Sequence, residues 1–210
     1  MNFIITVAHQ KGGVGKSTIA SNLAVELSKN MHVHVVDLDM QKSISYFNSV
    51  RSTNQLSINY ASSFDELKQI VNNNKHCLII DVGGFDSDLN RAAILAADFL
   101  LTPVSDSTIE LVGLLSFKNI MQEVRKIRPE LTASVLLNRV HVKTNTALNE
   151  INNFINENPE FSLMKSILRD RVEYKKAFEV GQSVTEFSNS GKAATEINNL
   201  INEIKKVIKW

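Results

Sequence analysis

The chain has little cysteine, proline or glycine, and each shortage excludes a class of protein. One cysteine, Cys77, in 210 residues excludes an internal disulfide framework and any four-cysteine zinc or iron–sulfur site within one chain. Three prolines and eight glycines argue against a long linker or a disordered region. No run approaches about 18 apolar residues, so no transmembrane helix is expected. The opening residues lack the pattern of a secretory signal, and we expect a cytoplasmic protein.

The chain also lacks an excess of either charge. Lysine and arginine number 23 against 22 aspartates and glutamates, which gives a net charge of +1. Any contact with nucleic acid must therefore come from a local basic patch. The contents of hydrophobic residues (43%) and charged residues (21%) are ordinary for a soluble globular chain. The length predicts a single domain over residues 1–210.

Short apolar runs alternate with amphipathic segments along the whole chain. Strands are expected at 3–8, 33–37, 56–60, 77–82, 99–103, 134–138 and 166–168. Helices are expected at 17–29, 64–73, 88–97, 108–128, 147–156, 171–180 and 193–209. Strands that are apolar on both faces and alternate with helices predict an α/β fold, a mostly parallel twisted sheet with helices on both faces. Ligands of such sheets bind beyond the carboxyl ends of the strands.

The most informative segment is 9–18, which reads His-Gln-Lys-Gly-Gly-Val-Gly-Lys-Ser-Thr. It follows an expected strand and opens a helix, the setting of a phosphate-binding P-loop rather than of a plain glycine-rich turn. Glycines let backbone N–H groups converge on phosphate, and the helix N-terminus favours an anion. We expect Lys16 at the β- and γ-phosphates, Ser17 on Mg²⁺ and Thr18 near the α-phosphate. The predicted cofactor-binding residues of this loop are Lys11, Gly12, Gly13, Val14, Gly15, Lys16, Ser17 and Thr18.

Two carboxylates, Asp37 and Asp39, stand two positions apart at the end of the expected strand 33–37. The strand period of two places both on one side, aimed past the carboxyl end. Carboxylates there suit a Mg²⁺ shell and the positioning of water. The alternative is a polar strand end without a role.

Two later strands also end in polar residues. Asp81 follows four apolar residues, as in a Walker-B strand, and can hold Mg²⁺ through a water. With Gly84 it forms a D-x-x-G segment, in which a glycine N–H can bind a γ-phosphate and move when that phosphate leaves. The alternative for Gly83 and Gly84 is a plain turn. Asn138 closes strand 134–138, and its amide suits the edge of adenine.

The P-loop departs from the standard spacing, because Gln10 replaces the first glycine and Lys11 adds a second lysine. The segment Lys-Gly-Gly-x-Gly-Lys-Ser resembles the deviant P-loop of the ParA/MinD family of ATPases. The resemblance implies ATP and Mg²⁺ as cofactors. It implies that Lys11 reaches the phosphates bound by a partner subunit, although a solvated loop lysine is the alternative.

The same resemblance assigns the other site residues. It implies that Asp39 positions the attacking water, so Lys11, Lys16 and Asp39 form the catalytic set. It places Asp37 near the metal, with Ser17, Asp37 and Asp81 as metal-site residues. Asn138 is implied at the base and Gly84 at the nucleotide. Met40 stands where the family often has proline, which weakens the expected turn there.

The resemblance extends over the whole chain, through patterns at 171–184 and 188–197. It is nearest to the small, ParF-like plasmid-partition members, which have no amino-terminal DNA-binding extension. It implies an ATP-dependent homodimer that binds nonspecific DNA. A small centromere-binding protein of the ParB/ParG kind is the expected partner, and a nucleoid-associated location follows. The candidate DNA-binding patches are Lys118/Arg125/Lys126/Arg128, Arg169/Arg171/Lys175/Lys176 and Lys205/Lys206/Lys209.

Two other functions stay open. A MinD-like, membrane-cycling ATPase would use the amphipathic tail 197–210 as an interfacial helix, although most such terminal helices pack on the sheet. A metabolic P-loop kinase or ligase would not need Lys11. The five histidines are scattered and are expected at ordinary surface or strand positions. Cys77 is expected to be a packing residue.

Overall fold

The computed structural model describes residues 2–107, 109–141 and 146–208 of the chain. Within these ranges a seven-stranded sheet has the order β3-β2-β4-β1-β5-β6-β7, and every neighbouring pair of strands is parallel. The strands are β1 Phe3–Val7, β2 Val33–Asp37, β3 Ser57–Asn59, β4 Cys77–Asp81, β5 Phe99–Val104, β6 Ala133–Val140 and β7 Phe161–Arg169. The predicted parallel α/β fold is therefore confirmed.

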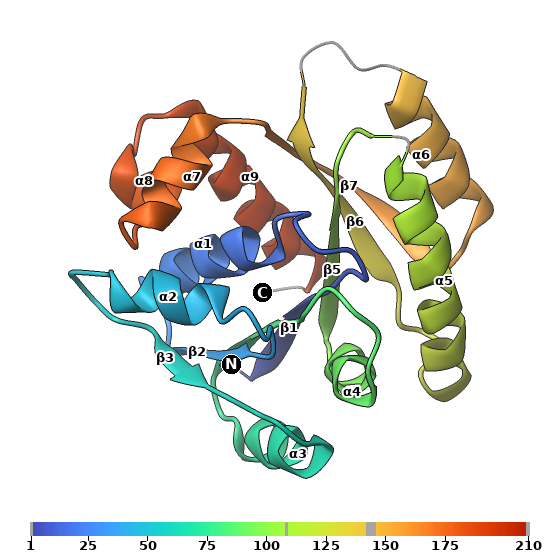
Figure 1. Ribbon diagram of the computed structural model, residues 1–210, viewed down its shortest axis with the longest axis horizontal. Coiled ribbons are helices and arrows are strands. Elements are labelled where there is room, and N and C mark those ends of the chain that lie inside the picture. The colour runs from blue at the N-terminus through green and yellow to red at the C-terminus, as the bar shows by residue number, and fades with distance from the viewer. Residues whose placement is uncertain (1, 108, 142–145, 209–210) are drawn as a thin grey trace.

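Helices cover both faces of the sheet (Figure 1). One face packs against α1 Lys16–Ser28, α2 Ser43–Ser49, α7 Val172–Glu179, α8 Val184–Phe187 and α9 Lys192–Val207. The other face packs against α3 Phe64–Asn73, α4 Asp88–Leu95, α5 Ile109–Ile127 and α6 Thr146–Glu157. Successive strand residues alternate between the two cores: Ile5 and Ile79 belong to the first, Ile4 and Ile80 to the second. Both faces are buried, which explains the continuous apolar runs in the sequence.

Most predicted elements lie within one or two residues of the observed ones, but three features were not predicted correctly. α2 and α8 were not expected, and β7 has nine residues where only 166–168 were predicted. β7 pairs only with β6, so it is an edge strand whose burial is irregular. It therefore lacks the apolar run by which the central strands were recognised. The predicted helix ends at 108 and 209 lie outside the described residues.

The C-terminal helix α9 packs on the sheet with its apolar face. Ile197, Leu200, Ile201 and Ile204 are all buried in the core. These four residues of the predicted interfacial tail are thus covered by protein, whereas Val207 is exposed and positions 209–210 lie outside the described residues. Among the described helices, none has the length and apolar character needed to cross a bilayer.

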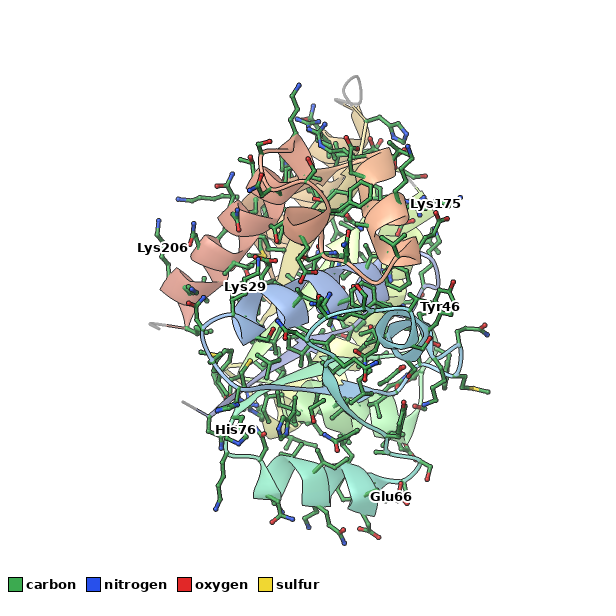
Figure 2. The ribbon with its side chains drawn as sticks, turned by 90° about the vertical axis from the view of Figure 1, so that its left-hand side faces the viewer. Lys29, Tyr46, Glu66, His76, Lys175 and Lys206 are labelled. Carbon is green, nitrogen blue, oxygen red and sulfur yellow. The ribbon has the colours of Figure 1, made fainter. Side chains whose placement is uncertain are left out.

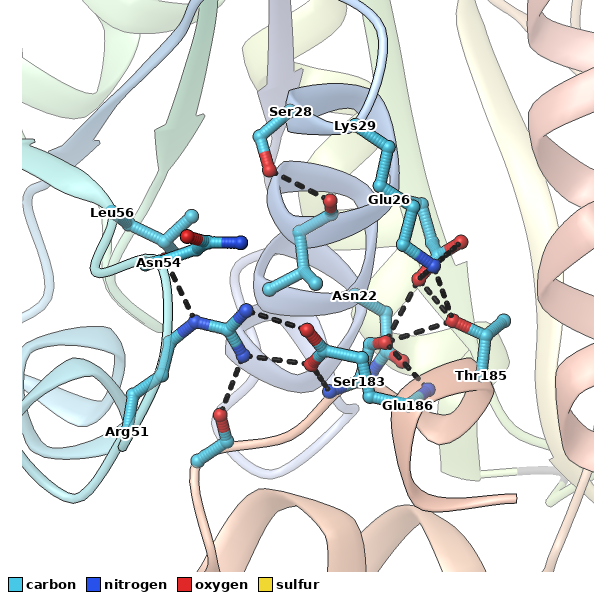
Figure 3. Close-up of polar contacts among 12 residues, drawn as sticks. Asn22, Glu26, Ser28, Lys29, Arg51, Asn54, Leu56, Ser183, Thr185 and Glu186 are labelled. Atoms are coloured by element: carbon cyan, nitrogen blue, oxygen red, sulfur yellow. Dashed lines mark hydrogen bonds and ion pairs between the residues drawn. The ribbon is translucent and has the colours of Figure 1, made fainter. Parts of the chain in front are cut away.

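A buried polar network joins the first helix to the C-terminal third of the chain (Figure 3). The Arg51 guanidinium donates to both carboxylate oxygens of Glu186, at 2.7 and 2.6 Å. The Ser183 hydroxyl donates to Glu26 of α1 at 2.8 Å, and Asn22 accepts the Val184 N–H at 2.8 Å. Every one of these contacts spans more than 130 residues of sequence. The network therefore fixes the position of α8 relative to α1.

The exposed basic residues lie on different parts of the surface. In Figure 2, Lys175 of α7 and Lys206 of α9 lie on opposite sides of the molecule, and both are exposed. Glu66 of α3 and His76 lie at the end of the view away from α7. Two of the predicted basic patches thus belong to separate surfaces.

Candidate functional site

The candidate site lies where the strand order changes direction. β1 sits between β4 and β5, so its following loop opens over a crevice at the carboxyl ends of the strands, where ligands of such sheets bind. A cavity of about 730 Å³ occupies this position. It is lined by the P-loop, by the loops after β2, β4 and β7, by the ends of β6 and β7, and by α7.

The P-loop glycines adopt backbone conformations that favour glycine. Gly13 has φ +79° and Gly15 has φ +94°, both in the left-handed region. Gly15 is the N-cap residue of α1 and offers no side-chain cap, so the first amides of the helix stay available to a ligand. Gly12, Gly13, Gly15, Lys16, Ser17 and Thr18 all line the cavity. The loop can therefore cradle an anion at the start of α1.

Lys16 is buried at the floor of the P-loop and donates from Nζ to the Lys11 carbonyl at 3.0 Å. Burial lowers the pKa of its ammonium, and the nearby Asp81 and Asp39 carboxylates oppose that shift. The ammonium is thus held inside the loop that would surround a phosphate.

The two acidic strand ends lie side by side, because Asp37 of β2 and Asp81 of β4 are partners in the strand register. Asp37 accepts hydrogen bonds from the Ser45 hydroxyl at 2.6 Å, the Ser45 N–H at 3.2 Å and the Asp39 N–H at 3.2 Å. Both oxygens of Asp37 are therefore engaged by the start of α2 and the loop before it. We conclude that Asp37 orders this loop in the structure.

Asp81 is fully buried, and neither of its oxygens makes a well-formed hydrogen bond with the described residues. Burial raises the pKa of this carboxyl to about 8, and although the neighbouring Ser17 hydroxyl lowers it, Asp37 raises it further. A buried carboxylate without partners normally indicates a missing cation or water. Since Mg²⁺ prefers carboxylate and water oxygens, Asp81 and Ser17 fit a magnesium shell at this position.

Asp39 and Gly84 face the same cavity. Asp39 is half-buried, and one of its oxygens accepts the Gln41 N–H at 3.0 Å. Gly84 lies against the P-loop, where a Cβ would come within 2.8 Å of the Gly12 nitrogen. The structure therefore brings together residues of three separate loops around one cavity, as the sequence predicted.

Asn138 and Arg139 form the opposite wall, at a register irregularity of β6. Asn138 is buried and donates from Nδ2 to the Val14 carbonyl at 2.7 Å. Arg139 has φ +57° and donates to the Gly13 carbonyl at 3.0 Å. Both side chains thus brace the P-loop backbone. Asn138 also lines the cavity, and its contact with a base remains a prediction.

Lys11 differs from Lys16, the other lysine of the loop, because it does not line the cavity. Its Nζ lies 2.5 Å from Oε1 of Glu110, in the first turn of α5. Its N–H donates to Nδ1 of His9 at 2.9 Å. His9 is buried rather than an ordinary surface position, and burial, with Lys16 and Lys11 nearby, lowers its pKa to about 3. A neutral His9 is therefore a constant acceptor for the Lys11 amide.

Four residues of this region were not predicted from the sequence. Glu110, His9, Arg139 and Ser45 all contact predicted site residues. Arg139 is adjacent to Asn138, and Ser45 lies shortly after the two aspartates, so proximity was an available signal for both. Glu110 lies 99 residues from Lys11 and had no signal in the sequence.

Comparison with known proteins identifies the family of this chain. The CobQ/CobB/MinD/ParA nucleotide binding domain matches residues 5–184. The maintenance of carboxysome distribution protein A of Halothiobacillus neapolitanus is 26% identical over 209 residues, covering 96% of each chain. Protein ParA of Rhizobium radiobacter is 25% identical over 210 residues, covering 93% of this chain and 91% of that one.

Solved structures share the fold. A putative plasmid partition protein from Borrelia burgdorferi, bound to AMPPNP, has a TM-score of 0.70 at 22% identity, covering 98% of this chain and 99% of that one. The septum site-determining protein MinD from Pyrococcus horikoshii, complexed with Mg-ADP, has a TM-score of 0.70 at 16% identity, covering 99% and 97%. Because the family match includes the P-loop and most of the sheet, the chain belongs to the CobQ/CobB/MinD/ParA family of nucleotide-binding domains.

Proposed function

We propose that the chain is a Mg²⁺-dependent ATPase that partitions DNA, a plasmid or a chromosome, by an ATP-controlled cycle of dimerisation. ATP binds in the cavity over the P-loop, with Lys16 at the β- and γ-phosphates and the backbone amides of Gly12–Thr18 around them. Asn138 contacts the adenine. The nucleotides named for the structural neighbours, AMPPNP and Mg-ADP, support this choice of ligand.

In the proposed reaction a water attacks the γ-phosphate and ADP leaves. Asp39 positions that water, and Gly84 binds the γ-phosphate through its N–H. Asp81 and Ser17 hold the Mg²⁺ that neutralises phosphate charge when bound, with Asp37 ordering the adjacent loop. We expect slow turnover by the chain alone, because a switch must persist longer than one encounter.

The observation that carries the proposal is the placement of Lys11. Its backbone belongs to the P-loop, yet its side chain lies outside the cavity of its own chain and is 37% exposed. A lysine that served the nucleotide in its own chain would line that cavity as Lys16 does. We therefore expect Lys11 to leave Glu110 and serve a nucleotide bound by a second copy, which makes association depend on ATP.

The dimer in this proposal holds nonspecific DNA, and a small centromere-binding partner stimulates hydrolysis and releases it. Three of the four cations in the patch Lys118/Arg125/Lys126/Arg128 are engaged locally: Lys126 pairs with Glu123, Arg128 with Glu130, and Arg125 donates to the Pro159 carbonyl. Lys175, Lys176 and Lys206 are exposed on α7 and α9, and Lys175 makes only a long contact of 3.9 Å with Glu179. We expect these exposed lysines to contact phosphates. The location that follows is the nucleoid.

The test is binding to random-sequence duplex DNA with ATP and with ADP over a salt series. The ATP state should bind, with affinity falling steeply as salt rises through counterion release, and the ADP state should not. Lys175→Ala combined with Lys176→Ala should reduce the salt slope, whereas Lys126→Ala should not. Lys16→Ala is the control without nucleotide. Equal binding in both nucleotide states, or none in either, would overturn DNA partition and leave a positioning ATPase with another cargo.

A further inference from the structure

The ion pair between Lys11 and Glu110 is partly buried beside the site. The two charged atoms lie 2.5 Å apart, and the Glu110 side chain is only 5% exposed. Its second oxygen, Oε2, is buried and has no hydrogen-bond partner among the described residues. Within the described part of the chain, Lys11 is thus the one cation bonded to this carboxylate.

The start of α5 holds Lys11 by its backbone as well as by its side chain. His9 accepts the Lys11 N–H at 2.9 Å, and Gly113 of α5 lies directly against the His9 ring. His9 also stacks on Phe117 of the same helix, with ring centroids 5.8 Å apart. Lys11 is therefore fixed at two points to one helix of its own chain.

A carboxylate and a nucleotide phosphate compete for the same ammonium. Lys11 donates a charge-assisted hydrogen bond to Glu110, and such bonds are the strong ones in proteins. To reach a nucleotide in a second copy, Lys11 must leave Glu110. Because Glu110 lies in the first turn of α5, the helix N-terminus stabilises its negative charge after the lysine has left. Lys11 can therefore move from Glu110 to a phosphate and return.

We propose that Glu110 is a positioning residue that holds the Lys11 ammonium on its own chain and so opposes ATP-dependent pairing until a second copy of this chain presents its phosphates. The inference rests on the proposed dimer. It assigns Glu110 a role in setting how tightly two nucleotide-bound copies associate. Each dimer requires two such exchanges, so the effect of Glu110 counts twice.

The experiment measures the dimer dissociation constant by sedimentation velocity, with the full chain, saturating AMPPNP and Mg²⁺. Glu110→Gln keeps the size of the side chain and removes its charge. The dissociation constant should fall about 100-fold, because two charge-assisted hydrogen bonds are lost per dimer and each is worth about a factor of ten. The matched control is Glu123→Gln on the same helix, whose partner Lys126 is exposed; its constant should equal that of the unmodified chain.

A second measurement reports the ion pair without any dimer. Thermal melting without nucleotide compares Lys11→Ala in two backgrounds. In the unmodified chain, Lys11→Ala should lower the melting temperature, because it leaves the buried Glu110 carboxylate unpaired. In the Glu110→Gln chain it should have little effect, because no carboxylate is left there. If Glu110→Gln fails to fold, Glu110→Asp replaces it in the test. Glu110→Asp shortens the side chain by one methylene and should also tighten the dimer.

The outcomes separate two failures. If the unmodified chain never pairs with AMPPNP and Mg²⁺, the proposed dimer is wrong. If it pairs, and Glu110→Gln leaves its dissociation constant unchanged or raises it, the role of Glu110 is wrong and the dimer stands. Equal destabilisation by Lys11→Ala in both backgrounds would likewise overturn the inference.

Discussion

The backbone of Gly84 lies directly on the backbone of Gly12. A Cβ at position 84 would approach the Gly12 nitrogen to 2.8 Å and its Cα to 2.9 Å, closer than side chains are found. The loop after β4 and the P-loop are therefore in direct contact. This contact gives Gly84 a packing role that the plain-turn alternative does not explain.

Gly84→Ala should consequently displace the P-loop. We expect ATP turnover to fall about 100-fold, since a misplacement near 1 Å can cost that much. The matched control is Gly83→Ala, whose Cβ would meet only the outer edge of the exposed Phe85 ring, which can turn aside. Phosphate release under saturating ATP measures both variants. Equal turnover in the two would contradict a special role for Gly84.

Asp39→Ala should trap an ATP-bound dimer. The variant removes the carboxylate proposed to position water but leaves the phosphate-binding residues intact, so binding persists while hydrolysis stops. Light scattering after addition of ATP and Mg²⁺ should report a stable dimer. The Asp39→Asn variant should behave in the same way, because an amide is a poor base. A variant that stays monomeric, or that hydrolyses ATP normally, would argue against the proposed role.

Arg51→Met should destabilise the fold through the network of Figure 3. The Arg51 side chain is 2% exposed, and its removal leaves Glu186 without its bidentate partner. We expect a loss of about 3–5 kcal/mol in the free energy of unfolding. Arg91→Met is the control, because Arg91 makes a bidentate pair with Asp86 that is open to solvent. Its cost should stay below about 1 kcal/mol. Urea unfolding of both variants gives the comparison.

His34 should make the chain less stable as the pH drops below neutrality, in addition to the effect of His9, whose pKa burial also lowers. Burial lowers the pKa of this histidine, and the neighbouring His76 and His32 lower it further. His76 lies 5.1 Å from His34 and 5.2 Å from His32 between ring centroids. A pKa depressed on folding means that the unfolded chain binds more protons, so stability is full above the unfolded pKa of about 6.5 and is lost below it.

His34→Val removes the titrating group and suits a strand position. The free energy of unfolding of this variant should depend less on pH between 7 and 5 than that of the unmodified chain. Above pH 7 the two pH profiles should run parallel. Identical slopes between pH 7 and 5 would show that His34 does not govern the acid sensitivity.

Local signals explain what was predictable. The helix Phe64–Asn73 has the bounds expected from sequence, because Ser63 caps it and accepts the Glu66 N–H. β4 was recognised by its apolar run, and the P-loop by its glycines and lysines. By contrast, α2 begins after Lys42, which has φ +51° and provides no side-chain cap. No residue in its first turn is acidic, so the usual signs of a helix start are missing.

The contacts of the site were predictable only in part. Loops that follow adjacent parallel strands must meet at one sheet edge, so the grouping of Asp39, Gly84 and Lys16 followed from the strand assignments. The residues that contact those loops from other elements did not follow from the strand assignments. Glu110 and His9 acquire their roles from how α5 packs against the end of β1, and that packing depends on tertiary structure rather than on any local pattern.

The polar network between α1 and α8 has a consequence for biosynthesis. Glu26 and Asn22 emerge from the ribosome early, yet the groups that satisfy them, Ser183 and Val184, are made 157 and 162 residues later. Until then the helix that carries the P-loop holds polar groups that cannot be buried without cost. We therefore expect nascent chains to acquire a finished nucleotide site only near the end of translation, which keeps incomplete copies from pairing with mature ones.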